Sequence, residues 1–255
     1  MRQQKPAVRA WAVVFWLLVW QGASLALRAI YPHGALLLAS PIDALRRLFE
    51  LALTAAFWQT VGISAARILG GFLVSCVLAL GLAALSARFR RVEELLSPLV
   101  ATVKAVPVAS FIILALVWVS GRSLSILISF LMVLPVLYSA VRTGIESADV
   151  QLLEMAQVFR VPFPRVLRSI YVPQVLPYFR SAISVALGLC WKSGTAAEVI
   201  GLSSGTIGER LYTAKVYFET PDLFAWTAVI VCISALFEKL FLLAVDKLTE
   251  KVGAK

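Results

Sequence analysis

The sequence predicts an all-α membrane protein that crosses the bilayer about six times. Its 255 residues are 60% hydrophobic, and the mean hydropathy of +0.88 lies far above that of an ordinary soluble domain. Charged residues make up only 15% of the chain and cluster between apolar runs long enough to span a membrane. The distribution of the +10 net charge over these connections is typical of membrane topology rather than of a nucleic-acid surface.

The first span is expected from Trp11 to about Leu27, behind a basic N-terminus of residues 1–10. Its tryptophans are unusual for a signal peptide and no small-residue cleavage site follows cleanly, so we expect an uncleaved span with a cytoplasmic N-terminus. Residues 31–56 then form an external segment. Within it Ser40-Pro41 can start a short helix, and apolar residues recur at helical spacing opposite charged ones. This pattern predicts an amphipathic helix at the membrane interface.

The second span is expected from about Thr60 to Leu85 and is rich in small residues, which let helices approach closely in lipid. Arg67 lies inside it near the outer end, either as a snorkelling side chain or as a charge at a pore mouth. After a short polar cytoplasmic connection, the third span is expected from Val106 to Ser120, and the fourth from Leu124 to about Val141. Pro107 and Pro135 predict kinks in these spans. The kinks belong either to a gate or simply to the packing of bent helices.

Residues 154–177, EMAQVFRVPFPRVLRSIYVPQVLP, interrupt the apolar runs with polar, basic and proline residues. Helix-favouring residues begin the stretch, and Pro162 and Pro164 should then break the helix. A second short helix is expected from about Arg165 to Tyr171, ended by Pro173. This unit would lie outside the hydrocarbon and expose Val161, Phe163 and three arginines, Arg160, Arg165 and Arg168. It is either a docking surface for another protein or a pair of amphipathic helices on the lipid headgroups.

The fifth span is expected from about Phe179 to Ile200 and carries Lys192 near its middle. An ionisable side chain at that depth is a functional candidate, so Lys192 borders a translocation path, forms a structural ion pair or snorkels. Glu198 lies six residues further on, so the two share no helix face, and pairing with another span is equally open. The external segment 201–222 ends in a turn at its last three residues, and the sixth span follows from Leu223 to about Val245.

The lysines and arginines test this topology. Sixteen of the 24 lie in the segments proposed as cytoplasmic, Lys104 among them, and six lie in those proposed as external. Such a bias places both termini, including the tail 246–255, in the cytoplasm.

Motifs that carry chemistry are absent from the sequence. There is no GxxxxGK(S/T) phosphate loop, no HExxH and no CxxC, and with His33 as the single histidine no nucleophilic triad can be proposed. The three cysteines lie inside apolar runs without metal-ligand spacing. We therefore expect a chain that is not an enzyme and binds no cofactor or metal. Any work against a gradient must then draw on a partner subunit or a coupled ion.

The stretch from Glu154 resembles the EAA motif of ABC-transporter permeases: Glu-Ala-Ala, three residues, Gly, nine residues, Ile, one residue, Leu-Pro. Glu154, Ala156, Ile170 and Pro173 fall on this pattern, while Met155 and Val172 replace its second residue and its leucine. Arg160 stands at the motif's glycine. Because arginine adopts a left-handed turn less readily than glycine, we expect Val161-Pro162 to make the turn instead. Segments 40–48 and 201–225 also resemble the nitrate/taurine/aliphatic-sulfonate branch.

The resemblance implies a bacterial inner-membrane permease with the type I importer (MetI-like) fold. A core over 57–245 would follow a first helix and external segment over 11–56. The loop 142–177 would bind a separate ATPase subunit, which holds ATP and Mg²⁺, through Glu154, Ala156, Arg160, Val161, Pro162, Phe163 and Arg165. Ile170, Pro173 and Pro177 would set the loop geometry. An external substrate-binding protein would deliver the solute, and a second permease copy, identical or not, would complete a path that Lys192, Glu198 and Arg67 could border.

Two rival classes stand beside this interpretation. A self-sufficient secondary transporter or channel would need intramembrane ion-coupling groups and often an internal repeat, and the chain offers only those three ionisable residues and no convincing repeat. A membrane enzyme would need clustered His, Asp or Cys near one membrane face, which the sequence lacks. We therefore expect an ABC importer permease for a small solute, such as a sulfonate, taurine, nitrate or a related small anion.

Overall fold

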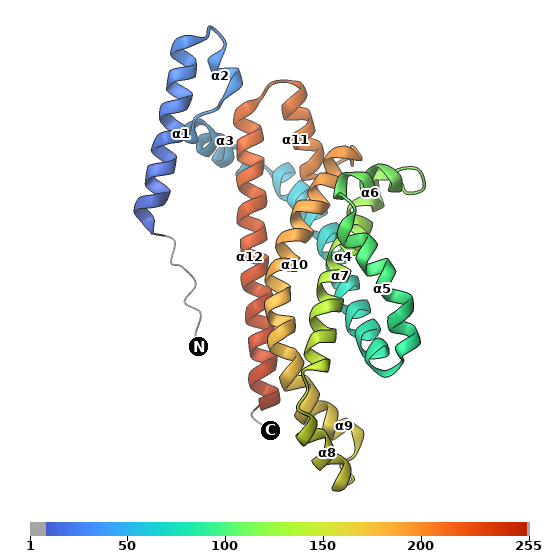
Figure 1. The fold of residues 1–255 in the computed structure, drawn as a ribbon. Helices are drawn as coiled ribbons and strands as arrows, with labels where there is room; N and C mark the ends of the chain where they lie inside the picture. Colours follow the sequence, from blue (N-terminus) through green and yellow to red (C-terminus); the bar gives the residue numbers. More distant parts are fainter. Residues whose placement is uncertain (1–8, 254–255) are drawn as a thin grey trace.

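The computed structural model describes residues 9–253, and within that range the chain is helical without strands. Four of the long helices form a bundle (Figure 1): α4 Ala55–Arg88, α7 Gly121–Glu146, α10 Val172–Ile200 and α12 Thr220–Gly253. The fifth, α1 Ala10–Ile30, stands apart from this bundle and packs mainly against α2 Gly34–Leu37 and α3 Pro41–Ala52. The other helices are α5 Arg90–Ala105, α6 Val108–Ala115, α8 Val150–Val158, α9 Phe163–Val166, the π-helical turn η1 Leu167–Tyr171 and α11 Ile207–Val216. The N-terminal basic residues Arg2 and Lys5 lie outside the described residues, as does Lys255.

The core of the bundle forms where α7 packs between α4 and α10. Its largest buried side chains include Phe72 of α4, Leu137 of α7 and Trp191 of α10. Two glycines bring the backbones together. A Cβ on Gly71 would lie 2.4 Å from the Ile126 carbonyl oxygen of α7, and one on Gly194 would lie within 2.7 Å of α4 and α7 side chains. The predicted role of small residues in close helix packing is therefore confirmed for these helices.

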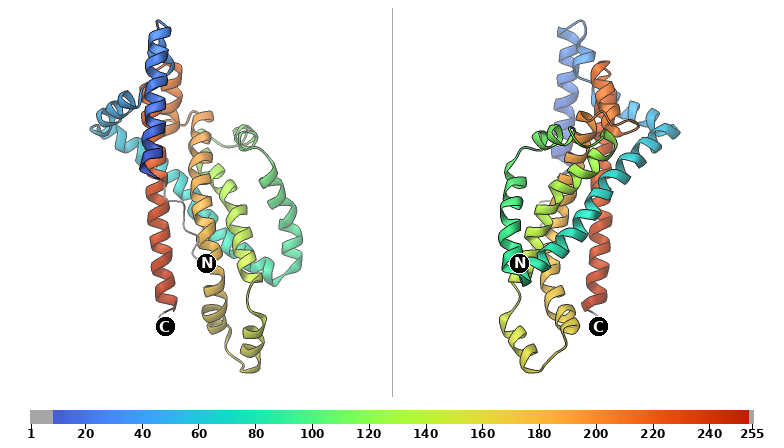
Figure 2. Two further views of the ribbon diagram at one scale, coloured as in Figure 1. Left: turned by 60° about the vertical axis from the view of Figure 1, so that its left-hand side comes forward. Right: turned by 90° about the vertical axis from the view of Figure 1, so that its right-hand side faces the viewer.

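Four helices in the described range are long and apolar enough to cross a membrane, namely α1, α4, α7 and α12, and the bent pair of α5 and α6 makes a fifth if counted as one span. The helix α10 is 29 residues long and runs along α7 and α12 (Figure 2), but polar residues lower its hydropathy. Of its charged residues Arg180 and Lys192 are exposed in this chain, whereas Glu198 is buried among neighbouring helices. The described residues thus hold four candidate spans, or five with the bent pair, and α10 is a further long helix packed beside them.

The third span differs from the sequence prediction. No continuous helix covers 106–120; instead α5 and α6 meet at an angle of 105°. The break follows from Pro107, which lacks an N–H and forces the preceding Val106 into an extended conformation. The residues expected to form a short polar connection therefore build α5, and α6 lies at the same end of the molecule as α11 (Figure 1). Lys104, at the other end of α5 from Arg90, donates a hydrogen bond to the Ser139 hydroxyl of α7 at 2.7 Å.

The predicted amphipathic helix is α3, and its start is defined by a capping box. The Ser40 hydroxyl accepts a hydrogen bond from the Asp43 N–H, and the Asp43 carboxylate accepts one from the Ser40 N–H. The hydrogen bond from the Ser40 hydroxyl, together with the ion pair with Arg28 of α1, holds the pKa of Asp43 below its ordinary value. This corner therefore ties α1 to α3.

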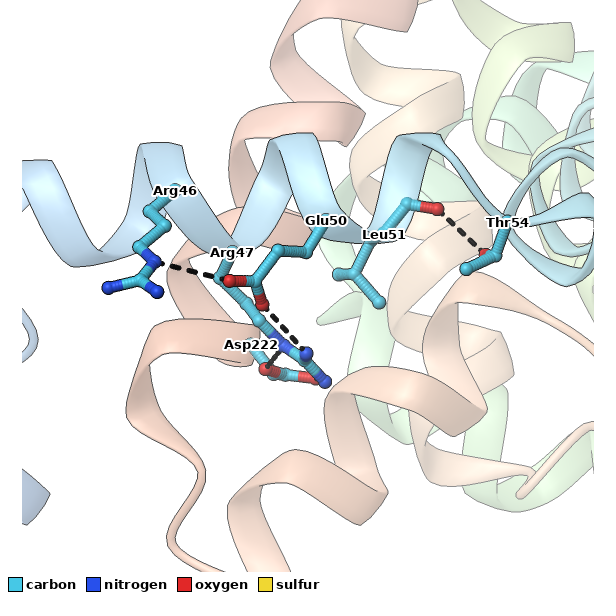
Figure 3. Close-up of polar contacts among 6 residues, drawn as sticks. All are labelled: Arg46, Arg47, Glu50, Leu51, Thr54 and Asp222. Atoms are coloured by element: carbon cyan, nitrogen blue, oxygen red, sulfur yellow. Dashed lines mark hydrogen bonds and ion pairs between the residues drawn. The ribbon is translucent and has the colours of Figure 1, made fainter.

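A second ion pair ties α3 to the start of α12. Arg47 donates to both carboxylate oxygens of Asp222, at 2.5 and 3.1 Å, and to Glu50 at 3.2 Å (Figure 3). The Asp222 and Glu50 contacts raise the pKa of Arg47 above its already high ordinary value. The helix α12 already begins at Thr220. The turn expected at 220–222 is therefore the first helical turn, where the Asp222 charge suits the helix dipole.

Candidate functional site: the loop between α7 and α10

The base of the loop is fixed to α10. Asp149 caps α8, its carboxylate accepting a hydrogen bond from the Gln151 N–H at 2.8 Å. The Asp149 N–H in turn donates to the side-chain oxygen of Gln174 at 2.9 Å. The helix thus begins at Val150, four residues before the motif glutamate, and the start of the loop is held beside the beginning of α10.

The reversal after α8 is made by Arg160 itself, not by Val161-Pro162 as expected. Arg160 has φ +50°, its N–H donates to the Gln157 carbonyl, and the Val161 N–H donates to the Ala156 carbonyl at 2.8 Å. This pair of bonds is the Schellman motif, which requires a left-handed residue at the position of Arg160. Arginine therefore takes the conformation for which the motif's glycine is suited, at a steric cost that glycine would avoid.

The second half of the loop continues into the membrane without a break. The short helix does not end at Pro173; α9, η1 and α10 follow one another with helical backbone at each junction. The Val172 N–H donates to the Leu167 carbonyl, the wide pattern of a π-turn. This turn lies where an α-helix would press the Pro173 ring against the carbonyl four residues earlier, and the widening accommodates it. Pro177 lies inside α10, and Ile170 is buried.

The tip of the loop carries exposed apolar side chains. Four of them define what we call the loop tip: Met155 is 50% exposed, Val158 78%, Phe159 74% and Phe163 69%. The tip lies at the end of the molecule opposite α6 and α11, beyond the bundle (Figures 1 and 2). Gathered apolar side chains of this kind mark a contact surface.

The predicted coupling residues fall on two sides of this tip. Arg160, Pro162 and Arg165 are exposed beside it, whereas Val161 is half-buried and Ala156 is buried beneath the reversal. Glu154 is exposed and has no hydrogen bond or ion pair among the residues that the structure describes. Its carboxylate is therefore left open to another chain, as the predicted contact with an ATPase subunit requires.

The three candidate path residues have different surroundings. Lys192 is exposed on α10 and has no hydrogen-bonding or ion-pair partner in the described part of the chain. Arg67 is half-buried, with its Nη1 enclosed and unpaired.

Glu198, by contrast, is fully enclosed, and its Oε2 accepts hydrogen bonds from the Ser64 hydroxyl at 2.8 Å and the Gly208 N–H at 3.3 Å. In this conformation Glu198 joins α10 to α4 and to the start of α11. It does not face an open path.

A family model described as "Binding-protein-dependent transport system inner membrane component" matches residues 71–253. The chain belongs to this family. The permease is 28% identical over 218 residues to a probable ABC transporter permease protein of Brucella melitensis biotype 1, which covers 85% of this chain and 88% of that relative. It is 28% identical over 194 residues to the putative aliphatic sulfonates transport permease protein SsuC of Bacillus subtilis, with 75% and 70% covered. It is 26% identical over 210 residues to the taurine transport system permease protein TauC of Escherichia coli, with 80% and 76% covered.

The permease is thus the membrane component of an ABC importer that works with a binding protein and an ATPase, and the predicted family, fold and branch are confirmed. Sequence reasoning missed three of the four tip residues, Met155, Val158 and Phe159, because apolar residues of a helix end are expected to face inward. The signal that could have found them is the glycine position of the motif, since a left-handed residue there ends α8 at Val158 and makes Phe159 its C-cap. No sequence signal connects Glu198 with Ser64.

Proposed function

We propose that the loop tip is where the ATPase subunit binds the permease, and that ATP and Mg²⁺ act on that subunit. The observation that carries this proposal is the exposed apolar cluster of Met155, Val158, Phe159 and Phe163 on a reversal fixed by backbone hydrogen bonds. Aromatic side chains on a rigid turn are suited to be the main binding contacts of an interface, because little conformational freedom is lost when they are buried.

The charges around the tip suggest the chemistry of its receptor. Arg160, Arg165 and Arg168 are exposed, and the described residues give none of them an ion pair. We expect the ATPase subunit to offer an apolar pocket with an acidic rim, which would speed association and fix the orientation of the loop.

The test is a pair of phenylalanine truncations in the permease expressed with its ATPase subunit. Phe159→Ala removes a tip side chain, and Phe89→Ala removes a comparably exposed phenylalanine between α4 and α5. We expect the first to weaken ATPase binding by about 30-fold, as the loss of a main interface contact does, and the second to leave it unchanged. Equal retention of the ATPase by both variants, each inserted at wild-type level, would sink the proposed contact.

We further propose that the permease transports a small anion of the sulfonate type along a path formed with a second permease copy. Support comes from the names of two relatives, for aliphatic sulfonates and for taurine, and from Lys192, an exposed and unpaired cation on α10. Such a charge is costly in lipid but suits a wet path that an anion crosses. Glu198 would then act behind this path, by holding α4, α10 and α11 together, while Arg67 would add a second cation, half-buried on α4.

The test of the path compares two exposed lysines on membrane helices, Lys192 on α10 and Lys239 on α12. We expect Lys192→Gln to reduce uptake of a radiolabelled sulfonate in proteoliposomes containing the complete importer, while ATPase binding is unchanged. Lys239→Gln should leave uptake near the wild-type level. If Lys192→Gln transports sulfonate at the wild-type rate while Lys239→Gln does not, the path lies elsewhere. Uptake that persists without any ATPase would favour a secondary transporter.

A further inference from the structure

A groove of about 460 Å³ opens between the end of α4, the end of α7 and the turn from η1 into α10. Its lining is almost entirely apolar and includes Leu80 and Ala84 of α4, Ile145 of α7, and Leu167 and Tyr171 of η1. Phe163 of the loop tip also borders it. The one charged lining residue is Arg88, the last residue of α4. A volume of this size is typical of sites that bind a small ligand.

The groove lies at the level where a membrane helix leaves the hydrocarbon. The apolar stretch of α4 ends here, and Arg88, Arg90 and Arg91 follow within four residues. Arginines in this position are typical of the headgroup layer. An occupant therefore meets an apolar wall on its membrane side and a guanidinium at the water interface.

The charges around the groove leave Arg88 available to an outside anion. The nearby acids are already engaged, because Glu93 pairs with Arg142 and Glu94 with Arg90. Arg88 has no ion pair or hydrogen bond among the described side chains and lies only near the ring of Phe89, at 5.6 Å. A guanidinium is well suited to a phosphate group.

We propose that this groove binds one anionic phospholipid of the leaflet that faces the loop, with an acyl chain along the apolar lining and the phosphate on Arg88. Basic pockets between membrane helices on the cytoplasmic side recognise such headgroups. In this groove the apolar lining suits the acyl chain of a lipid, and Arg88 suits its phosphate. Because Leu167 and Tyr171 line it, the bound chain would brace the π-turn that joins the loop to α10. The inference does not depend on which solute is transported.

The experiment titrates the purified, delipidated full-length permease with phosphatidylglycerol and, separately, with phosphatidylcholine, and counts retained lipids by native mass spectrometry. We expect the first phosphatidylglycerol to bind the wild type about tenfold more tightly than Arg88→Gln, which lacks one charge-assisted contact. Arg91→Gln, a neighbouring exposed arginine outside the groove lining, is the matched control and should bind as the wild type does. Ala84→Phe, which fills the apolar wall, should reduce retention of both lipids.

Each alternative occupant gives a different result. If Ala84→Phe changes permease–permease assembly while lipid retention stays the same, the groove belongs to a second copy and the proposal fails. If inorganic phosphate displaces phosphatidylglycerol, Arg88 binds a free anion and the apolar wall is not involved. Equal retention of phosphatidylglycerol by the wild type and Arg88→Gln would overturn the headgroup assignment. Because Arg88 is exposed, its substitution should not disturb the fold, so this comparison tests the proposal even if Ala84→Phe does not fold.

Discussion

Replacing Arg160 by glycine should make the loop more rigid. Arginine at φ +50° carries the cost of the left-handed conformation, about 1–2 kcal/mol for a residue with a Cβ. Glycine avoids that cost but loses more freedom on folding, about 0.5–1 kcal/mol. The net gain of roughly 0.5–1 kcal/mol corresponds to a two- to fivefold lower population of the opened reversal.

Hydrogen exchange of the peptide that contains the Val161 amide measures this population directly, because that N–H is bonded to Ala156 only while the reversal is closed. Arg160→Gly should slow exchange by about two- to fivefold. Arg160→Ala keeps the Cβ and removes the charge, so it should exchange as the wild type does. Arg160→Pro should speed exchange strongly, since proline cannot adopt a positive φ and has no N–H to donate. If Arg160→Ala slows exchange as much as Arg160→Gly does, the charge of Arg160 and not its backbone strain determines how often the reversal opens.

Three further predictions concern the end of the permease that holds α3, α11 and the start of α12. Gly208→Ala would place a Cβ 2.3 Å from the Cβ of Glu198 and should destabilise the fold by about 1–3 kcal/mol. Gly188→Ala, whose Cβ would meet open space on α10, should leave the stability unchanged. Unfolding in detergent measures the stability of both variants. A double-mutant cycle on Arg47 and Asp222 should give a coupling of about 0.2–1 kcal/mol, because the pair is partly exposed. A coupling of zero would show that this ion pair does not tie α3 to α12. The pKa of Asp43 is lowered in the folded state, so its ionised carboxylate stabilises the fold fully above the ordinary pKa of about 4. This stabilisation disappears as the pH falls through the lowered pKa. The difference in melting temperature between the wild type and Asp43→Asn should therefore shrink in acid, and a difference that grows in acid would contradict the argument.

The sequence predicted most of the elements because each had a local cause. The length of the apolar stretches predicted α1, α4, α7 and α12, and Ser40-Pro41 predicted the start of α3. The errors arose where a proline or a charged residue was judged by its usual preference. Pro107 was treated as a kink in a span although it separates α5 from α6, and Pro173 was treated as a stop although the π-turn carries the helix past it.

The candidate site shows the same division between local and long-range causes. The loop position and its motif residues followed from composition and spacing, but the exposed tip depends on the conformation of one residue, Arg160. The contacts of Glu198 with Ser64 and Gly208 join residues 134 and 10 positions apart. Such contacts depend on how helices pack, and periodicity in a single sequence holds no information on the partner chosen across the bundle.

The continuity of the helix from the loop through η1 into α10 gives the proposed coupling a mechanical basis. Its 29 residues in α10 extend about 44 Å, from a base bonded to Asp149 to an end where Glu198 holds α4 and α11. A displacement of the loop tip would therefore reach the opposite end of the permease along a ladder of backbone hydrogen bonds. The ladder is weakest from the π-turn into the first turns of α10, where Pro173 and Pro177 supply no N–H. In the proposed arrangement the permease would bend there first, beside the groove whose lining includes Leu167 and Tyr171, so an occupant of that groove would limit how much of the displacement is lost before it reaches α10.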